Sequence, residues 1–412
     1  MPSEVQKWFR LTLLNLLIVA FIGVLLRYKI AFSLPFLDQK FLLHGHSHFA
    51  FAGWITQALM TLMVAYLFAN GQAEAFKKYK TLLIFNLITA YGMLCSFPVQ
   101  GYGFFSITFS MLSIFVSYTF AIEFWQDLKK ISEKKVSILW FKAALVFSVF
   151  SSIGPFSLSY MMATHNLHEK WYLSSVYFFL HFQYNGWFFF ACMGLLMHKL
   201  EEFGVRSKAL NRVFWYFFFA CIPAYFLSVL WIPIHLSIYM LVVISSIIQL
   251  IGWFIFLNTI KPYRKILLSG INRTGRILIL LAGVALTIKL FLQIGSTHPQ
   301  LSQIAFGFRP IVIGYLHLVL LGMISLYIIG YAVAQKIISI GKTALVGLII
   351  FVSGVIFNEV VLMIQGVEAM EGESVDSIHN YLFAIAIMMF GGIFILVRSQ
   401  FLKMNPDSYR DE

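Results

Sequence analysis

Long apolar runs separated by short polar turns make up almost the whole chain. Runs of about 20 residues, enough to cross about 30 Å of hydrocarbon at 1.5 Å per residue, recur from one end to the other. No polar insertion is long enough to fold alone, so we predict one transmembrane domain over 1-412, an all-α bundle of twelve transmembrane helices. The predicted spans are 9-27, 43-68, 80-97, 102-125, 137-161, 172-197, 210-231, 235-258, 274-295, 309-333, 342-365 and 378-398.

The composition places this bundle in lipid. The chain is 60% hydrophobic and only 11% charged, and a soluble core cannot enclose that much apolar surface. The amino end reads MPSEVQKWFR before the first apolar run, with no small-residue cleavage site ahead of Arg27. We therefore expect an uncleaved first span.

Basic residues alternate between the turns in a way that predicts topology. If the amino terminus is cytoplasmic, the inner turns are basic and the outer side holds an acidic loop, which is the positive-inside pattern. This predicts cytoplasmic termini in a bacterial-type inner or plasma membrane, and contact with anionic lipid accounts for the net charge of +13 without nucleic acid. The inner basic residues are Lys77, Lys78, Lys80, Lys129, Lys130, Lys134, Lys135, Lys199, Arg206, Lys208, Arg212, Lys261, Arg264, Lys265, Arg273, Arg276, Lys336 and Lys342, and the outer acidic ones are Glu368, Glu371, Glu373 and Asp376.

The three cysteines point to no chemistry. Cys95, Cys192 and Cys221 each stand alone in or at the end of a span, so neither a disulfide framework nor a Cys-x-x-Cys-His haem attachment is present. Small buried hydrophobic side chains are the simplest interpretation.

Histidine gathers at one pole of the predicted bundle. On this topology ten of the eleven histidines lie on the outer half or surface, and only His198 is inner. Three of the ten, His48, His181 and His317, sit about 8 to 14 Å below the outer boundary on spans two, six and ten. An interhelical hydrogen bond would explain any one of them. Three at one depth favour a metal or haem layer, because neutral imidazole is a common metal ligand.

In a helix, the three histidines of HGHSHFAFAGW at 44-54 do not all lie on one face. His44 and His48 are four residues apart and share a face, whereas His46 lies about 200° round from either. The three cannot all bind one centre. His48 is the deepest and is our candidate for an axial haem ligand, and His44 or His46 could bind a haem propionate or lie at the interface.

This plan resembles the large subunit of the heme-copper oxidase superfamily, which includes cytochrome c oxidase subunit I and the nitric oxide reductase large subunit. GVLLR at 23-27 is similar to the end of the family's first helix, and HSHFAFAGW to its haem-binding second helix. VIGYLHLVLLGMISLYIIGY in span ten is similar to the family's His-x-His segment, with His317 on the second histidine. The resemblance implies a low-spin haem, b-type, held by His48 and His317 and suited to electron transfer.

The sequence departs from the family pattern where a second metal would bind. Tyr315 replaces the histidine for the high-spin haem, and it could ligate haem iron or simply pack. His181 in HFQYN matches a copper ligand, but Gln183 and Tyr184 depart from the residues that follow it in the family. WIPIH offers only His235 where the family has paired histidines. Copper or non-haem iron at His181 and His235 is therefore an altered site at most.

Two further histidines and four charged residues complete the candidate site. His165 and His168 lie in a short outer loop and could replace missing copper ligands or be solvated. Arg27 and Arg309 lie on the outer side, where the resemblance places haem propionates, and interface anchoring is the alternative. Lys289 and Glu359 lie inside spans nine and eleven and could pair or serve a proton route, for which Glu359 is the better candidate.

The sequence thus predicts a membrane haem protein that transfers electrons and reduces a diatomic gas, dioxygen or nitric oxide, as a terminal oxidase or nitric oxide reductase does. Electrons would come from a donor protein or a quinol, because the chain has no soluble cytochrome or copper domain of its own, and further membrane subunits are expected partners. Two alternatives stay open: a non-catalytic haem- or copper-binding protein of nitric oxide tolerance or metal handling, and a twelve-span transporter with a histidine-lined path.

Overall fold

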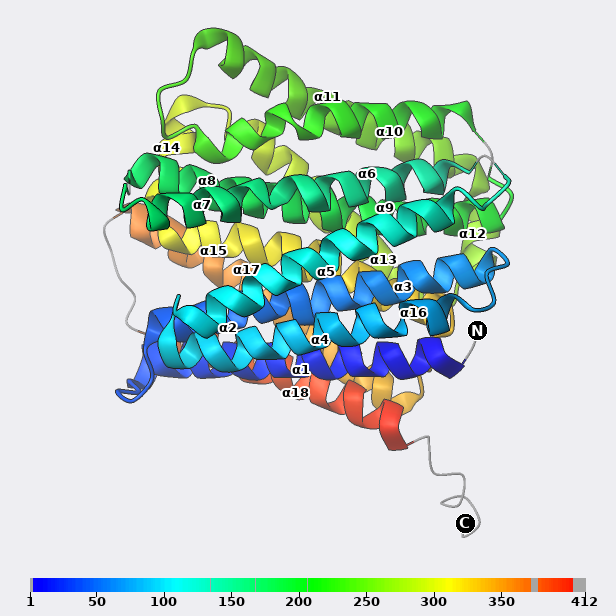
Figure 1. Ribbon diagram of the computed structural model, residues 1–412, viewed down its shortest axis with the longest axis horizontal. Coiled ribbons are helices and arrows are strands. Elements are labelled where there is room, and N and C mark those ends of the chain that lie inside the picture. The colour runs from blue at the N-terminus through cyan, green and yellow to red at the C-terminus, as the bar shows by residue number, and fades with distance from the viewer. Residues whose placement is uncertain (1–2, 134, 167, 206, 372–376, 403–412) are drawn as a thin grey trace. The chain divides into compact units, whose positions relative to one another are not determined.

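Helices form nearly all of the computed structural model, which describes residues 3–133, 135–166, 168–205, 207–371 and 377–402. No β-strand occurs in these ranges (Figure 1). Four residues of the predicted charge pattern, Lys134, Arg206, Glu373 and Asp376, lie outside the described residues. The prediction of an all-helical membrane bundle is confirmed at this level.

Ten helical runs in the described ranges are long and apolar enough to cross a membrane, and the bent pair Lys208–Cys221 and Pro223–Val229 is an eleventh candidate. The predicted span 172-197 is also one helical run, Glu169–Glu202, but it is not among them. His181, Gln183 and Asn185 make the middle of this run polar. The count of twelve spans, and the oxidase-like fold that the family resemblance implies, stay predictions.

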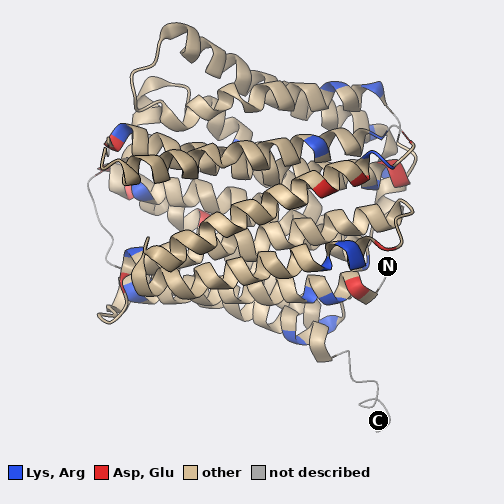
Figure 2. Cartoon of the chain, in the orientation of Figure 1, with Lys and Arg blue, Asp and Glu red and all other residues tan. Residues whose placement is uncertain are grey.

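Charged residues lie mostly near the ends of the helices, as the coloured cartoon in Figure 2 shows for the described residues. Polar caps fix several of these ends. The Asp38 carboxylate accepts the backbone N–H of Phe41 at 2.8 Å and begins α2, Gln39–Phe49. The Ser207 hydroxyl accepts the N–H of Ala209 and begins α10, Lys208–Cys221. Such caps satisfy N–H groups that a helix leaves unpaired in its first turn, so they set where each span starts.

The chain packs as two compact units, and the first joins the two ends of the sequence. Within it α1 packs against α18, α17 against α18, and α2 against α4. Gly45 lets α2 approach α4 closely, because a Cβ there would lie 3.0 Å from Pro98 Cγ. The helices of this unit are α1 (Ser3–Phe32), α2, the π-helical segment η1 (Ala50–Thr56), α3 (Gln57–Ala69), α4 (Ala75–Gln100), α17 (Lys342–Glu371) and α18 (Ile378–Leu402), with the first part of α5 (Phe104–Leu128) and most of α16 (Leu326–Ala334).

Helices α17 and α18 touch backbone to backbone, which makes Gly392 sensitive to any side chain. A Cβ there would lie 2.5 Å from Phe351 N and 2.7 Å from Gly347 O, so the Gly392→Ala variant must separate the two helices. We expect its free energy of unfolding to fall by about 1–3 kcal/mol. Thermal unfolding in detergent measures this against Gly391→Ala, whose Cβ meets no atom within 4 Å. Equal melting temperatures for the two variants would contradict the expectation.

The second unit contains the middle of the chain. Within it α6 packs against α9, α7 against α8, and α10 against α11, while the π-helical segments η2 and η5 meet each other. Its helices are the remainder of α5, α6 (Val136–Ser151), α7 (Ile153–Ala163), α8 (Glu169–His181), η2 (Phe182–Phe188), α9 (Phe189–Glu202), α10, the 3₁₀ segment η3 (Pro223–Val229), α11 (Leu236–Ile260), η4 (Lys261–Tyr263), α12 (Arg264–Gly270), most of α13 (Arg273–Gly295), α14 (Pro299–Gly307), α15 (Arg309–His317) and η5 (Leu318–Ser325).

Candidate functional site

Each of the three deep histidines stands at the start of a π-helical segment. His48 lies one residue before the end of α2, and η1 begins at Ala50. His181 ends α8 immediately before η2, and His317 ends α15 immediately before η5. A π segment adds one residue to a helical turn, and such insertions occur often at functional sites. The three histidines therefore have the same kind of backbone conformation after them, as well as the same predicted depth.

The hydrogen bonds at the ends of these segments follow one pattern. The N–H groups of Gln57, Phe189 and Leu326, which follow η1, η2 and η5, each bond to the carbonyl three residues back, and the N–H of Leu326 bonds also to Leu321, five residues back. None of the three bonds to the carbonyl four residues back, the α-helical partner. Side chains reach two of those carbonyls: Asn15 donates to Gly53, and the Cys221 thiol donates to Asn185 at 3.7 Å. The bundle thus satisfies backbone groups that its π segments release.

The sequence carries a signal for these segments that hydrophobic periodicity does not detect. Each histidine is followed five residues later by glycine and then by tryptophan or methionine, in HFAFAGW, HFQYNGW and HLVLLGM. His181 follows His48 by 133 residues, and His317 follows His181 by 136. The two spacings differ by only three residues, and the three segments form a short repeated motif. Side chains beside Gly53 and Gly186 leave no room for a Cβ, which would lie 2.6 Å from Phe49 Cε2 and from Phe147 Cβ respectively.

His48 is held by aromatic side chains of the first unit. Its ring stacks on Phe97 with centroids 4.3 Å apart and planes 18° apart, and its Nε2 lies 3.3 Å from Tyr102 Oη. The tyrosine contact is at the long end for a hydrogen bond. Phe97 is fully buried, whereas Tyr102 is 42% exposed. The stack thus fixes the imidazole plane and leaves Nε2 opposite a side chain that sits at the surface.

The predicted separation of the neighbouring histidines is confirmed. His44 and His48 share a face, because both rings contact Phe97 and Tyr102. His46 lies on another face: its Cε1 is 3.5 Å from the position of a Cβ on Gly23 of α1. The three side chains therefore do not converge on one centre.

His317 has the hydrogen bond that metal-ligating histidines usually make. Its Nδ1 lies 2.8 Å from the carbonyl oxygen of Ile313, one turn earlier in α15, and must donate there because a carbonyl only accepts. The neutral imidazole then carries its lone pair on Nε2, the nitrogen that can bind iron. Tyr315 faces the second π segment, with its ring centroid 6.3 Å from that of Tyr184 in η2. The Nδ1–H of His317 is therefore oriented as in a metal-ligating histidine, and Tyr315 lies beside the segment that follows His181.

His181 is fully engaged by the protein. Its Nε2 donates to the carbonyl oxygen of Cys221 at 2.9 Å, and its Nδ1 accepts from the Asn185 amide at 3.1 Å. The Cys221 carbonyl needs this donor because Tyr225, its α-helical partner, bonds instead to Ile222 where the helix breaks at Pro223. In this arrangement neither ring nitrogen offers a lone pair to a metal. The side chain does not fit a copper or iron ligand and instead completes a broken span.

The other candidate metal ligand, His235, serves as a helix cap. Its Nδ1 accepts from the Ser237 hydroxyl at 2.8 Å and from the Ser237 N–H at 3.3 Å, at the start of α11. In the described ranges no three His, Cys, Asp or Glu side chains are grouped so that they could hold a metal ion. His165 and His168, between α7 and α8, belong to no such group.

The candidate charged residues lie in different surroundings. Arg309 is the exposed first residue of α15, and Arg27 is half-buried in α1. Glu359 is half-buried in α17 and accepts a hydrogen bond from the Asn358 amide at 3.2 Å. These positions agree with an interface role for Arg309. They leave the predicted roles of Arg27 and Glu359 untested.

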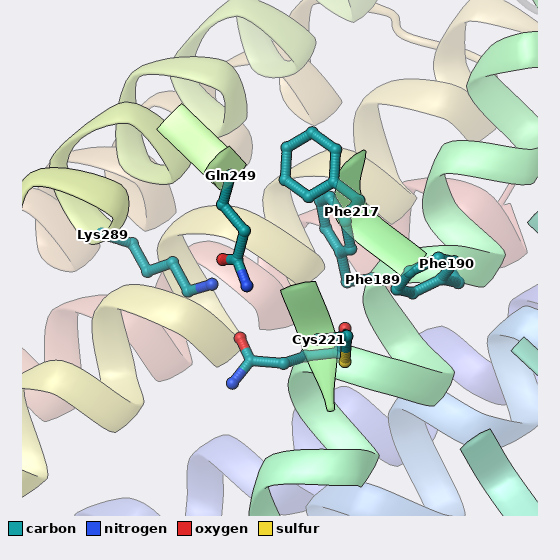
Figure 3. A pocket seen from close by; sticks show the side chains of 7 residues that line it. Phe189, Phe190, Phe217, Cys221, Gln249 and Lys289 are labelled. Carbon is teal, nitrogen blue, oxygen red and sulfur yellow. The ribbon is translucent and has the colours of Figure 1, made fainter. Parts of the chain in front are cut away.

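A small cavity in the second unit is lined by Lys289 of α13. The cavity measures about 10 Å³ for the centre of a water molecule, which is room for one. Lys289 and Gln249 point toward one another from α13 and α11 (Figure 3), and Asn185 and Cys221 also line the space. Each of these four side chains is at least nine-tenths buried. Among the described residues of this unit no carboxylate forms an ion pair with Lys289, and the amides of Gln249 and Asn185 line the same cavity.

Comparison with known proteins gives no further identification: no protein-family model matches the chain, and no curated protein matches it.

Proposed function

We propose that the chain is a membrane haem protein that resembles the heme-copper oxidase large subunit and transfers electrons through a low-spin haem. His48 and His317 are its proposed axial ligands, and Arg27 and Arg309 the proposed partners of the haem propionates. A haem with two histidine ligands supplies reversible one-electron transfer. The reaction class that the resemblance implies is the reduction of dioxygen or nitric oxide.

The observation that carries this proposal is the hydrogen bond between His317 and Ile313. It directs Nδ1–H to a carbonyl at 2.8 Å and leaves Nε2 as the basic nitrogen, as in most metal-bound histidines. His48 supports it with a ring plane fixed by the stack on Phe97. Both residues stand at the first position of a His-x₄-Gly segment. The two proposed ligands therefore precede π-helical segments of the same kind.

His181 and His235 do not provide ligands for the second metal of an oxidase. Both ring nitrogens of His181 are hydrogen-bonded to protein atoms, and His235 caps a helix. We therefore assign no step to a metal at His181. This favours the variant in which the chain passes electrons or binds haem for nitric oxide tolerance without reducing the gas itself. For the full reaction, Tyr315 remains a proposed ligand or neighbour of a second centre, and Glu359 a proposed proton-handling residue.

The proposed setting is a bacterial-type inner or plasma membrane with both termini cytoplasmic. The ten membrane-length helices support a membrane location, and the basic turns support this orientation. A quinol or an electron-donor protein is the proposed source of electrons. Lipid and further membrane subunits are the other proposed partners.

An optical difference spectrum of the purified protein tests the proposal. Produced with ample haem, the reduced-minus-oxidised spectrum should show narrow low-spin b-type bands, and carbon monoxide should leave them unchanged because both axial positions are filled. A carbon monoxide shift would point to a second, reactive centre and to gas reduction by this chain. If the wild-type protein binds neither iron nor haem, the proposal fails and transport along a histidine-lined path becomes the leading function.

A further inference from the structure

Two asparagines from neighbouring helices hold the π segment that follows His48. Asn15 of α1 donates its side-chain N–H to the carbonyl oxygen of Gly53 at 2.5 Å. Asn86 of α4 donates to the carbonyl oxygen of Ala52 at 3.0 Å. Both asparagine side chains are 1% exposed. Two consecutive carbonyls of η1 are thus bound from two different helices of the same unit.

The π segment creates the need for these donors. The N–H of Gln57 passes over the Gly53 carbonyl and bonds to Trp54, so Gly53 lacks its α-helical partner. A buried carbonyl without a donor is costly, and no water reaches a fully packed helix to replace one. Asn15 therefore compensates for the extra residue in η1. Replacing it should favour a return to ordinary α-helical bonding in this turn.

Further hydrogen bonds fix the orientation of both asparagines. The Tyr91 hydroxyl donates to Asn15 Oδ1 at 2.7 Å, so the Asn15 amide cannot turn over without losing that bond. Asn86 also donates to Gln57 Oε1 at 2.7 Å. The network ties α1, α3 and α4 to a single turn of the second span.

That turn sets the direction of His48. A change from π-helical to α-helical bonding removes the offset of one residue, which rotates the preceding helix by about 100° relative to α3. We propose that Asn15 and Asn86 are positioning residues that keep the His48 imidazole in its ligating orientation by stabilising η1. The inference rests on the proposed haem function, but its first step, the stabilisation of η1, does not.

Hydrogen exchange on the haem-free protein tests the first step. Mass spectrometry should show faster amide exchange over 50–57 in Asn15→Leu and Asn86→Leu, by about tenfold, which corresponds to the loss of one net hydrogen bond. Thr12→Val is the matched control, because Thr12 is equally buried in α1 and its hydroxyl donates to Phe9 of its own helix. Wild-type exchange in the two leucine variants would overturn the inference.

Electron paramagnetic resonance and the reduction potential of the haem-loaded protein test the second step. In Asn15→Leu the low-spin g-values and the potential should both shift, with some haem becoming high-spin, whereas Thr12→Val should match wild type. Tyr91→Phe keeps Asn15 but removes the hydrogen bond that fixes the orientation of its amide. It should give an intermediate shift in the g-values and the potential. Faster exchange with unchanged g-values and potential would reduce Asn15 to a purely structural residue. If wild type binds no haem, the proposed function and this second step fall together, and the exchange result stands by itself.

Discussion

The His317→Ala variant is expected to lose the low-spin haem bands completely while the protein still folds. His317 is half-buried at the end of α15, and that helix has no fully buried residue, so removing the ring disturbs little packing. The loss of one axial nitrogen leaves five-coordinate iron or no haem at all. The reduced-minus-oxidised spectrum and the haem-to-protein ratio measure the change.

Chemical rescue distinguishes ligation from structure in that experiment. His317→Gly leaves space for a free imidazole, and adding imidazole should restore the low-spin bands. His298→Ala is the control, because His298 lies on the same predicted outer side and is no proposed ligand. Wild-type bands in His317→Ala would show that the iron ligand lies elsewhere.

The second large effect is expected in stability, at His181. His181→Leu leaves the Cys221 carbonyl and the Asn185 amide without partners in a fully buried place. We expect the free energy of unfolding to fall by about 2–4 kcal/mol, as for two buried polar groups losing their hydrogen bonds. The haem bands of the folded fraction should stay unchanged. Thermal unfolding and the optical spectrum, measured on one preparation, report both quantities.

A glutamine at the same position provides the comparison. The His181→Gln variant keeps one donor and one acceptor at the end of a flexible side chain, so it should recover part of the stability that His181→Leu loses. A metal ligand would behave differently. If His181→Leu melts like wild type but loses a bound copper that wild-type protein contains, the structural role assigned to His181 is wrong.

The apolar pattern predicted the helical bundle, which depends on composition. It missed the π segments, which depend on the local backbone conformation. Apolar length was enough to predict a helical bundle, and a spacing of four residues was enough to put His44 and His48 on one face. The π segments escaped prediction because hydrophobic periodicity assumes 3.6 residues per turn throughout a helix. A one-residue insertion changes that phase without changing the apolar content.

The role of His181 could not be predicted for a related reason. A sequence pattern does not distinguish a histidine whose nitrogens bind a metal from one whose nitrogens form hydrogen bonds at a broken helix. Pro223 lies forty-two residues further along the chain, and nothing in the sequence pairs it with His181. Only the fold brings the Cys221 carbonyl to the imidazole.

The π segments also divide three spans into halves that should differ in their tolerance to mutation. α15 has no fully buried residue, and α8 has only His181, whereas η5 and α9 are mostly buried. In the second span, α2 buries three residues and the following α3 nearly all of its thirteen. Saturation mutagenesis should therefore find permissive positions before each histidine and intolerant ones after it, with the change falling within one turn. A chain of this kind can vary the residues before each histidine while the packing after it stays fixed.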